Sequence, residues 1–165
     1  VVLKDPIGTQ TGVLELALLE QNIPCQMLYA VDIDRNALSM LRQLLAISNY
    51  AGRDKIQLVE STMTDVSLPP ASIDVGIILS VAAFHGRIDP RGNISHDGKA
   101  LQCLTTIRNA LKPDGRIYVF FSKNDQEEDL FPLITASYKN VGFRVLKKQI
   151  ITIGGQLDYH VVFGR

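Results

Sequence analysis

The alternation of short apolar runs with segments of helical period constrains the fold more than any other feature of this sequence. The run at 73–79 is almost wholly apolar, as expected for a central strand covered on both faces. The predicted strands span 1–3, 27–31, 56–59, 73–79, 117–121 and 143–147, and the predicted helices span 13–21, 35–48, 99–111 and 129–139. Strands and helices that alternate through short connections predict a parallel sheet with helices on both faces.

The end of the sequence departs from this alternation. A strand extension at 150–153 and a last strand ending near Phe163 are separated by Gly154-Gly155, which is a tight-turn signal. Two strands joined by a turn, with no helix between them, pair antiparallel. We therefore predict an α/β fold whose sheet is finished by an antiparallel C-terminal hairpin.

Two stretches rich in glycine and proline are predicted to lie outside helices and strands. Lys112-Pro113-Asp114-Gly115 ends the preceding helix, because proline cannot continue it and glycine takes the tight turn. The stretch at 81–97 contains two glycines and a proline and is predicted to be a long loop. Its length and composition fit a mobile cover over a site.

Length and composition limit the classes of function. A chain of 165 residues suits a single domain spanning 1–165, and its opening without methionine indicates residues removed upstream or a domain cut from a longer chain. Its 17 basic and 17 acidic residues argue against a nucleic-acid platform held by bulk charge, although RNA recognised by a local basic patch stays open. No apolar run approaches the roughly 20 residues that a membrane span needs. We interpret Cys25 and Cys103 as buried free thiols, which predicts an intracellular, cytoplasmic, soluble protein without a metal site.

The first candidate site lies where the first predicted strand leads into a helix. The connecting loop contains Gly8 and Gly12, and glycines let the backbone approach a ligand closely. The helix N-terminus that follows offers free N–H groups to a carboxylate or phosphate. A plain strand-to-helix turn would explain the two glycines equally well.

Asp32, at the end of the second predicted strand, is the second candidate. An acid about 20 residues after a glycine loop can accept hydrogen bonds from both hydroxyls of a ribose. Its structural alternative is to cap the following helix, but Asp34 is better placed for that role. This assignment leaves Asp32 for a ligand.

Together with the order of elements, three segments resemble the class I S-adenosylmethionine-dependent methyltransferases. The segments are Tyr29-Ala30-Val31-Asp32-Ile33-Asp34, Ser72-Ile73-Asp74-Val75 and Leu111-Lys112-Pro113-Asp114-Gly115-Arg116. The resemblance covers nearly the whole chain. It implies a Rossmann-like three-layer sandwich with a mostly parallel seven-stranded sheet, the last strand being inserted antiparallel. It also implies S-adenosylmethionine as cofactor and S-adenosylhomocysteine as product.

The resemblance assigns cofactor-binding positions one at a time. Asp32 matches the ribose-binding acid, with Ile33 beside it, and Gly8 and Gly12 match the first and last glycines of the loop after the first strand. Two positions of that loop depart from the family pattern, because Pro6 stands at the acid and Gln10 at the middle glycine.

The remaining cofactor positions follow the third and fourth strands. Thr62 stands where the family has an acid near the adenine amino group, with Asp65 as a possible substitute for that acid. Met63 would pack on the adenine face, and Ser80 would line the mouth of the cofactor site.

His85 is the candidate catalytic residue. It follows the fourth strand, as a histidine does in many small-molecule and RNA methyltransferases of this fold, and a neutral imidazole suits a general base at physiological pH. The alternative is a loop histidine that packs on Phe84. His96 and His160 are interpreted as a solvent-exposed and a structural histidine.

Two functions remain open from the sequence. The first is an active methyltransferase acting on a small molecule or RNA. The second is a methyltransferase-like domain that has lost cofactor binding and serves as a scaffold or protein-binding module in a larger protein. No helices precede the first strand, so we expect a protein partner or further domains to supply a substrate lid.

Overall fold

The computed structural model describes residues 2–4, 20–21, 26–47, 51–62, 65–79, 87–88, 94–95, 98–122, 130–153 and 156–165. The strands of its main sheet are β1 (Val2–Lys4), β2 (Leu28–Asp32), β3 (Ile56–Glu60), β4 (Ile73–Leu79), β7 (Leu111–Ser122), β8 (Arg144–Ile153) and β9 (Gln156–Gly164). The helices are α2 (Arg35–Ile47), α3 (Gly98–Ala110) and α4 (Leu130–Asn140), with a 3-10 turn at Arg53–Lys55.

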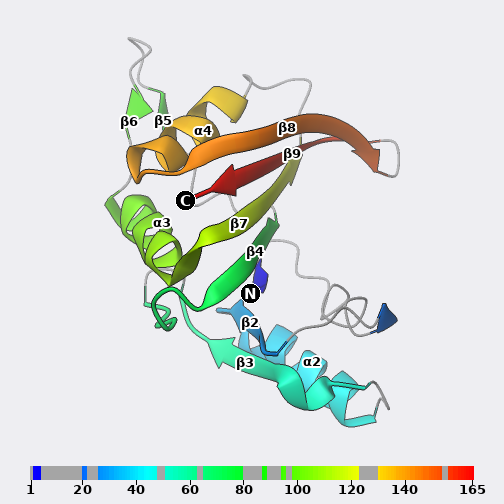
Figure 1. Ribbon diagram of the computed structural model, residues 1–165. Helices are drawn as coiled ribbons and strands as arrows, with labels where there is room; N and C mark the ends of the chain where they lie inside the picture. Colours follow the sequence, from blue (N-terminus) through cyan, green and yellow to red (C-terminus); the bar gives the residue numbers. More distant parts are fainter. Residues whose placement is uncertain are drawn as a thin grey trace.

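These strands form a seven-stranded sheet with the order β3-β2-β1-β4-β7-β9-β8 (Figure 1). The first five strands in this order pair in parallel. β9 is antiparallel to both of its neighbours, β7 and β8. The last strand is therefore inserted inside the sheet, and the α/β class predicted from the sequence is confirmed.

Two hydrophobic cores lie on opposite faces of this sheet. Leu104 of α3 and Tyr138 of α4 belong to the larger core, which also includes Val31 of β2. Leu41 of α2 packs in a smaller core with Ala30, the residue before Val31. Consecutive residues of a strand point to opposite faces. Hence α3 and α4 cover one face, and α2 covers part of the other.

The C-terminal strand agrees with its prediction, the predicted loop at 81–97 differs from what is observed, and the first predicted helix lies almost wholly outside the described residues. The strand predicted at 143–147, with its extension at 150–153, is observed as one continuous strand, β8. The predicted loop at 81–97 contains β5 (Arg87–Ile88) and β6 (Ile94–Ser95), which pair antiparallel as a separate two-stranded sheet. The predicted helix at 13–21 lies outside the described residues except for its last two positions.

The turn predicted at Lys112–Gly115 is instead a bulge inside β7. Ile73 of β4 pairs with Leu111, whereas Val75, two residues on, pairs with Arg116. Residues 112–115 therefore bulge out of the ladder, where a proline without an N–H group removes no ladder bond. The composition correctly predicted where α3 ends, but pairing with β4 makes the tetrapeptide part of a strand.

Gly115→Ala is expected to destabilise the fold by about 1–3 kcal/mol, the usual cost of overpacking a core. A Cβ atom at this position would lie 2.7 Å from Cγ of Leu111 and 2.9 Å from the carbonyl oxygen of Ile73. Leu111 is fully buried, so neither neighbour has space to move. The matched control is Gly98→Ala, because a Cβ there meets nothing within 4 Å. Urea denaturation followed by circular dichroism measures both, and equal stabilities would contradict the prediction.

Candidate functional site

The candidate site lies at the carboxyl edge of the parallel strands. From β1 the chain moves outward through β2 and β3, then returns to place β4 on the other side of β1. Strand order therefore reverses between β1 and β4. In open α/β sheets, ligands bind beyond the carboxyl ends of the strands at such a reversal.

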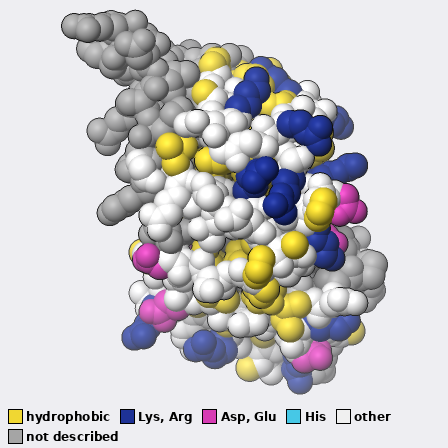
Figure 2. All heavy atoms as spheres, turned by 60° about the vertical axis from the view of Figure 1, so that its left-hand side comes forward, with side chains coloured by type: hydrophobic (Ala, Val, Ile, Leu, Met, Phe, Trp, Pro, Cys, Tyr) yellow, Lys and Arg dark blue, Asp and Glu magenta, His cyan; other side chains and the backbone are white. Residues whose placement is uncertain are grey.

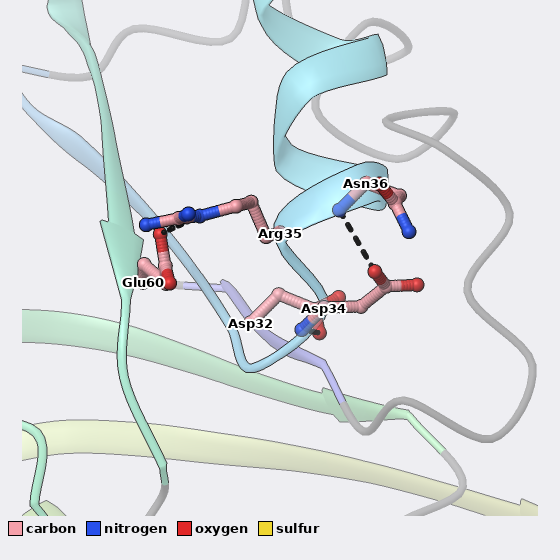
Figure 3. A network of polar contacts seen from close by, with 5 residues as sticks. All are labelled: Asp32, Asp34, Arg35, Asn36 and Glu60. Atoms are coloured by element: carbon pink, nitrogen blue, oxygen red, sulfur yellow. Dashed lines mark hydrogen bonds and ion pairs between the residues drawn. The ribbon is translucent and has the colours of Figure 1, made fainter.

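Asp32 is the last residue of β2 and is held rigidly beside this reversal (Figure 3). Its side chain is only 4% exposed, and its Oδ1 accepts a hydrogen bond of 2.8 Å from the backbone N–H of Asp34. Its carbonyl oxygen accepts the N–H of Ser61 at 3.1 Å. The first turn of α2 follows directly, and the N-terminal end of a helix favours a nearby negative charge. The carboxylate is thus fixed by its neighbours before any ligand binds.

Asp34 caps α2, as predicted. Its Oδ1 accepts the backbone N–H of Asn36 at 2.8 Å, and its carbonyl oxygen accepts the N–H of Leu38 at 3.1 Å (Figure 3). The prediction that the cap leaves Asp32 entirely to a ligand needs correction, because Asp32 also takes part in this turn. A carboxylate readily accepts a hydrogen bond from the backbone N–H two residues later in the chain, as Asp32 does from Asp34.

An ion pair joins the start of α2 to the end of β3. Nε of Arg35 lies 3.1 Å from Oε2 of Glu60, and both side chains are largely exposed (Figure 3). A pair of this kind stabilises a protein by about 0–1 kcal/mol. No local sequence pattern indicates this contact, because its two partners lie 25 positions apart in the chain.

Ile33 projects from the same turn into solvent. It follows Asp32 directly and is 50% exposed. The turn therefore presents an apolar surface next to a fixed acid. A nucleoside has matching chemistry, since its ribose carries hydroxyls and its base has an apolar face.

Thr62 and Asp65 meet just beyond the end of β3. The Thr62 hydroxyl donates a hydrogen bond of 2.5 Å to Oδ2 of Asp65, and the Asp65 N–H bonds back to the hydroxyl oxygen at 3.2 Å. The carbonyl oxygen of Thr62 accepts the N–H of Val66 at 3.0 Å. The structure therefore brings the exposed Asp65 carboxylate to the threonine that the sequence analysis paired with it.

Five predicted site residues lie outside the described part of the chain. They are Gly8, Gly12, Met63, Ser80 and His85. Their assigned roles stay predictions. The described residues bring together Asp32 and Ile33 at one strand end and Thr62 with Asp65 at the next, since β2 and β3 are paired neighbours.

Other reactive groups of the described residues lie away from this edge. Cys103 of α3 is buried, as predicted, and burial raises the pKa of its thiol to about 12. Among the described residues, no group of His, Cys, Asp and Glu side chains is arranged to hold a metal ion. Within the same residues, every helix is too short or too polar to span a membrane.

Comparison with protein-family profiles identifies a family for this chain. Residues 7–119 match the sequence profile of a family described as methyltransferase domain, which is more than half of the 165 residues. No curated protein sequence matches the chain.

Solved structures share the fold. The glycopeptide N-methyltransferase MtfA, complexed with sinefungin, superposes with a TM-score of 0.75 at 14% identity, over 99% of this chain and 85% of its own. It has also been crystallised with S-adenosyl-L-methionine and with S-adenosyl-L-homocysteine.

Two further structures have other named activities. The Burkholderia thailandensis 1,6-didemethyltoxoflavin-N1-methyltransferase, with 1,6-didemethyltoxoflavin and S-adenosylhomocysteine bound, gives a TM-score of 0.66 at 18% identity over 99% and 70% of the two chains. The (4+2)-cyclase SpnF superposes with a TM-score of 0.72 at 8% sequence identity, over 99% of this chain and 73% of its own. At these identities the likeness concerns the fold alone.

Proposed function

Because the chain belongs to the methyltransferase domain family, we propose that it binds S-adenosylmethionine at the carboxyl edge of its sheet and catalyses transfer of the methyl group. The observation that carries this proposal is the buried Asp32 carboxylate, fixed at the end of β2 beside the reversal of strand order. A charge in that place suits a ligand with paired hydroxyls, because a carboxylate has two oxygens that accept hydrogen bonds.

The described residues fit the adenosine part of this cofactor. Asp32 would accept the ribose hydroxyls, and the exposed Ile33 would pack against the base. Asp65, held beside Thr62, would accept the amino group of the base and so supply the charge that threonine lacks. Gly8 and Gly12 would let the backbone approach the methionine part, with Met63 and Ser80 lining the site. When bound, the cofactor supplies a methyl group that its sulfonium already activates.

A small molecule or RNA would be the methyl acceptor. Two of the solved neighbours are named as a glycopeptide N-methyltransferase and a 1,6-didemethyltoxoflavin-N1-methyltransferase, which supports a small organic substrate. The protein's part in methyl transfer is mainly to hold donor and acceptor in line. His85 would orient the acceptor or take its proton.

Titration calorimetry with S-adenosylmethionine and S-adenosylhomocysteine tests the proposal. Micromolar binding of both by the folded protein would support a cofactor site and justify a screen of acceptors. Absence of binding at millimolar ligand, with the fold verified by circular dichroism, would contradict it.

His85→Ala is expected to lower turnover by about 10²–10⁴, the usual contribution of general acid–base catalysis, while cofactor affinity stays nearly unchanged. Once an acceptor has been identified, steady-state rates and cofactor titration measure the two effects separately. His96→Ala is the matched control in the same stretch of sequence. An equal loss of affinity and turnover would remove His85 from the catalytic role.

The second candidate function is a scaffold that no longer binds the cofactor. Pro6 and Gln10 depart from the family pattern in the glycine loop, and the Thr62 hydroxyl is occupied by Asp65. The named activity of the cyclase SpnF supports the view that this fold serves purposes other than methyl transfer. The calorimetric experiment distinguishes the two candidates directly.

A further inference from the structure

Part of the sheet has no described helix over one of its faces. On the covered face, Ile117 of β7 and Val161 of β9 pack in the large core under α3 and α4. On the opposite face, the core of α2 contains residues of β2 and β3 alone among the residues that the structure describes. Val162 of β9 is buried but belongs to neither core. Parallel strands such as β4 and β7 are normally covered on both faces, whereas the antiparallel pairs β7–β9 and β9–β8 can leave one face open to solvent. The side of β4 and β7 opposite α3 is therefore a place where a partner would fit.

The strand registers define which side chains share this face. Val75 of β4, Arg116 of β7 and Arg144 of β8 lie in one row, because Arg116 pairs with Val75 on one side and with Gly164 on the other, and Gly164 pairs with Arg144. Residues that pair directly project to the same face. Tyr118 and Lys147 lie in the next row, on either side of Val162.

Leu146 joins this surface through the bulge in β8. The register shifts between Val145 and Lys147, and a Cβ atom at Gly164 would lie 2.9 Å from Cδ1 of Leu146. The leucine side chain therefore lies over Gly164, between Arg116 and Arg144. We call the surface formed by these six residues the basic-rimmed face: Val75, Arg116, Tyr118, Arg144, Leu146 and Lys147.

The basic-rimmed face also carries exposed apolar side chains, which lie in the same row as its two arginines. Val75 is 43% exposed and Leu146 is 50% exposed, and the half-buried Tyr118 lies between their strands. Large apolar side chains grouped on the surface of a protein commonly mark an interaction site.

The exposed charged side chains that define this face are basic, and one of them, Arg116, lies between Val75 and Leu146. Arg116, Arg144 and Lys147 are all exposed, whereas the acid on the same face of β9, Asp158, is partly buried and lies two rows beyond Tyr118. The chain as a whole has no net charge, so this excess is local. Figure 2 shows lysine and arginine side chains gathered in its upper half, the end of the molecule that contains β7, β9 and β8, with few acidic ones among them.

We propose that the basic-rimmed face docks an amphipathic helix with acidic flanks, contributed by another protein. Its four strands span about 14 Å across, which accommodates the roughly 10–12 Å diameter of a single helix. Apolar side chains of the helix would cover Val75 and Leu146, and its acidic residues would meet Arg116, Arg144 and Lys147. A second copy of the chain is disfavoured, because an isologous contact would bring these positive charges together.

The aromatic residues argue against single-stranded RNA as the ligand. The rings of Phe120 and His160 stack with centroids 4.5 Å apart, and the rings of Tyr118 and His160 with centroids 5.8 Å apart. Nucleobases stack on ring faces that are open to solvent. The rings of Tyr118, Phe120 and His160 instead stack on one another. Val75 and Leu146 would also gain nothing from a phosphate backbone.

A designed peptide tests the docking proposal. The probe is an 18-residue helix with leucines spaced three and four apart, glutamates on both flanks and one tryptophan. The protein has no tryptophan, so the fluorescence of the peptide reports binding without background. We expect a Kd of about 10–100 µM, typical of a small interface, and at least tenfold weaker binding when lysines replace the glutamates. Binding of the two peptides with equal affinity, or of neither, would overturn the proposal.

Variants locate the binding surface. Leu146→Glu and Arg116→Glu are each expected to weaken binding at least tenfold, whereas Ile47→Glu, on the 80% exposed position at the end of α2, leaves it unchanged. Circular dichroism verifies folding, and Leu146→Gln replaces Leu146→Glu if the latter does not fold. Equal effects at Leu146 and Ile47 would overturn the proposal. Displacement of the peptide by single-stranded RNA would assign the surface to nucleic acid instead. This test is independent of cofactor binding.

Discussion

Asp32→Asn is expected to weaken the binding of S-adenosylmethionine by about 10- to 150-fold, which corresponds to about 1.5–3 kcal/mol. The expectation follows from the proposed role of the carboxylate, whose charge-assisted bonds to the ribose hydroxyls would become ordinary ones. Asparagine keeps an Oδ1 atom that can still accept the N–H of Asp34, so the turn should survive. Titration calorimetry of the variant beside the unmodified protein measures the difference.

Two further variants separate binding from folding. Asp32→Ala should lose at least as much affinity but also some stability, because the N–H of Asp34 loses its partner. Asp34→Ala removes the helix cap while sparing Asp32, and is expected to cost about 1 kcal/mol of stability with little change in affinity. If Asp32→Asn binds the cofactor as well as the unmodified protein, Asp32 does not belong to the site.

Phe163→Ala is expected to lower the free energy of unfolding by about 3–5 kcal/mol, the range for removing a buried aromatic side chain. Phe163 is fully buried on β9, where its ring stacks on that of Tyr138 with a centroid distance of 4.1 Å. Its ring also forms a T-shaped pair with that of Phe143, with centroids 6.4 Å apart. The substitution leaves a cavity between the sheet and α4, and its cost is a large part of the roughly 5–15 kcal/mol that stabilises a typical domain.

Urea denaturation followed by circular dichroism measures this loss. Ile47→Ala is the matched control, because its side chain is 80% exposed on α2 and its removal should change stability by no more than about 0.5 kcal/mol. Phe163→Leu retains most of the apolar volume and should lie between the two. A loss below 1 kcal/mol for Phe163→Ala would show that the core repacks around the missing ring.

Local patterns predicted the elements well. The helix predicted at 35–48 is observed as α2 over Arg35–Ile47, and the strand predicted at 73–79 is β4 with the same bounds. The cap at Asp34 and the antiparallel C-terminal hairpin were also correct. These features depend on residues close together in sequence, whose spacing and turn chemistry act before any tertiary contact forms.

The errors arose where distant segments decide the structure. Lys112–Gly115 has the composition of a turn, yet pairing of the flanking Leu111 and Arg116 with β4 incorporates it into β7. Gly and Pro content predicted a loop at 81–97, although β5 and β6 pair within it. Helix and strand boundaries of this kind depend on partners that a single sequence does not identify.

The sequence by itself therefore determined the succession of strands and helices, the position of Asp32 at a strand end and the cap that begins α2. Tertiary structure alone decided that Thr62 and Asp65 lie at the strand end next to Asp32, that Arg35 pairs with Glu60, and that Val75 and Leu146 share an exposed face. The physical reason is the range of the interactions. Periodicity and capping act over a few residues, whereas strand order, register and burial join segments many residues apart, whose pairing no local pattern specifies.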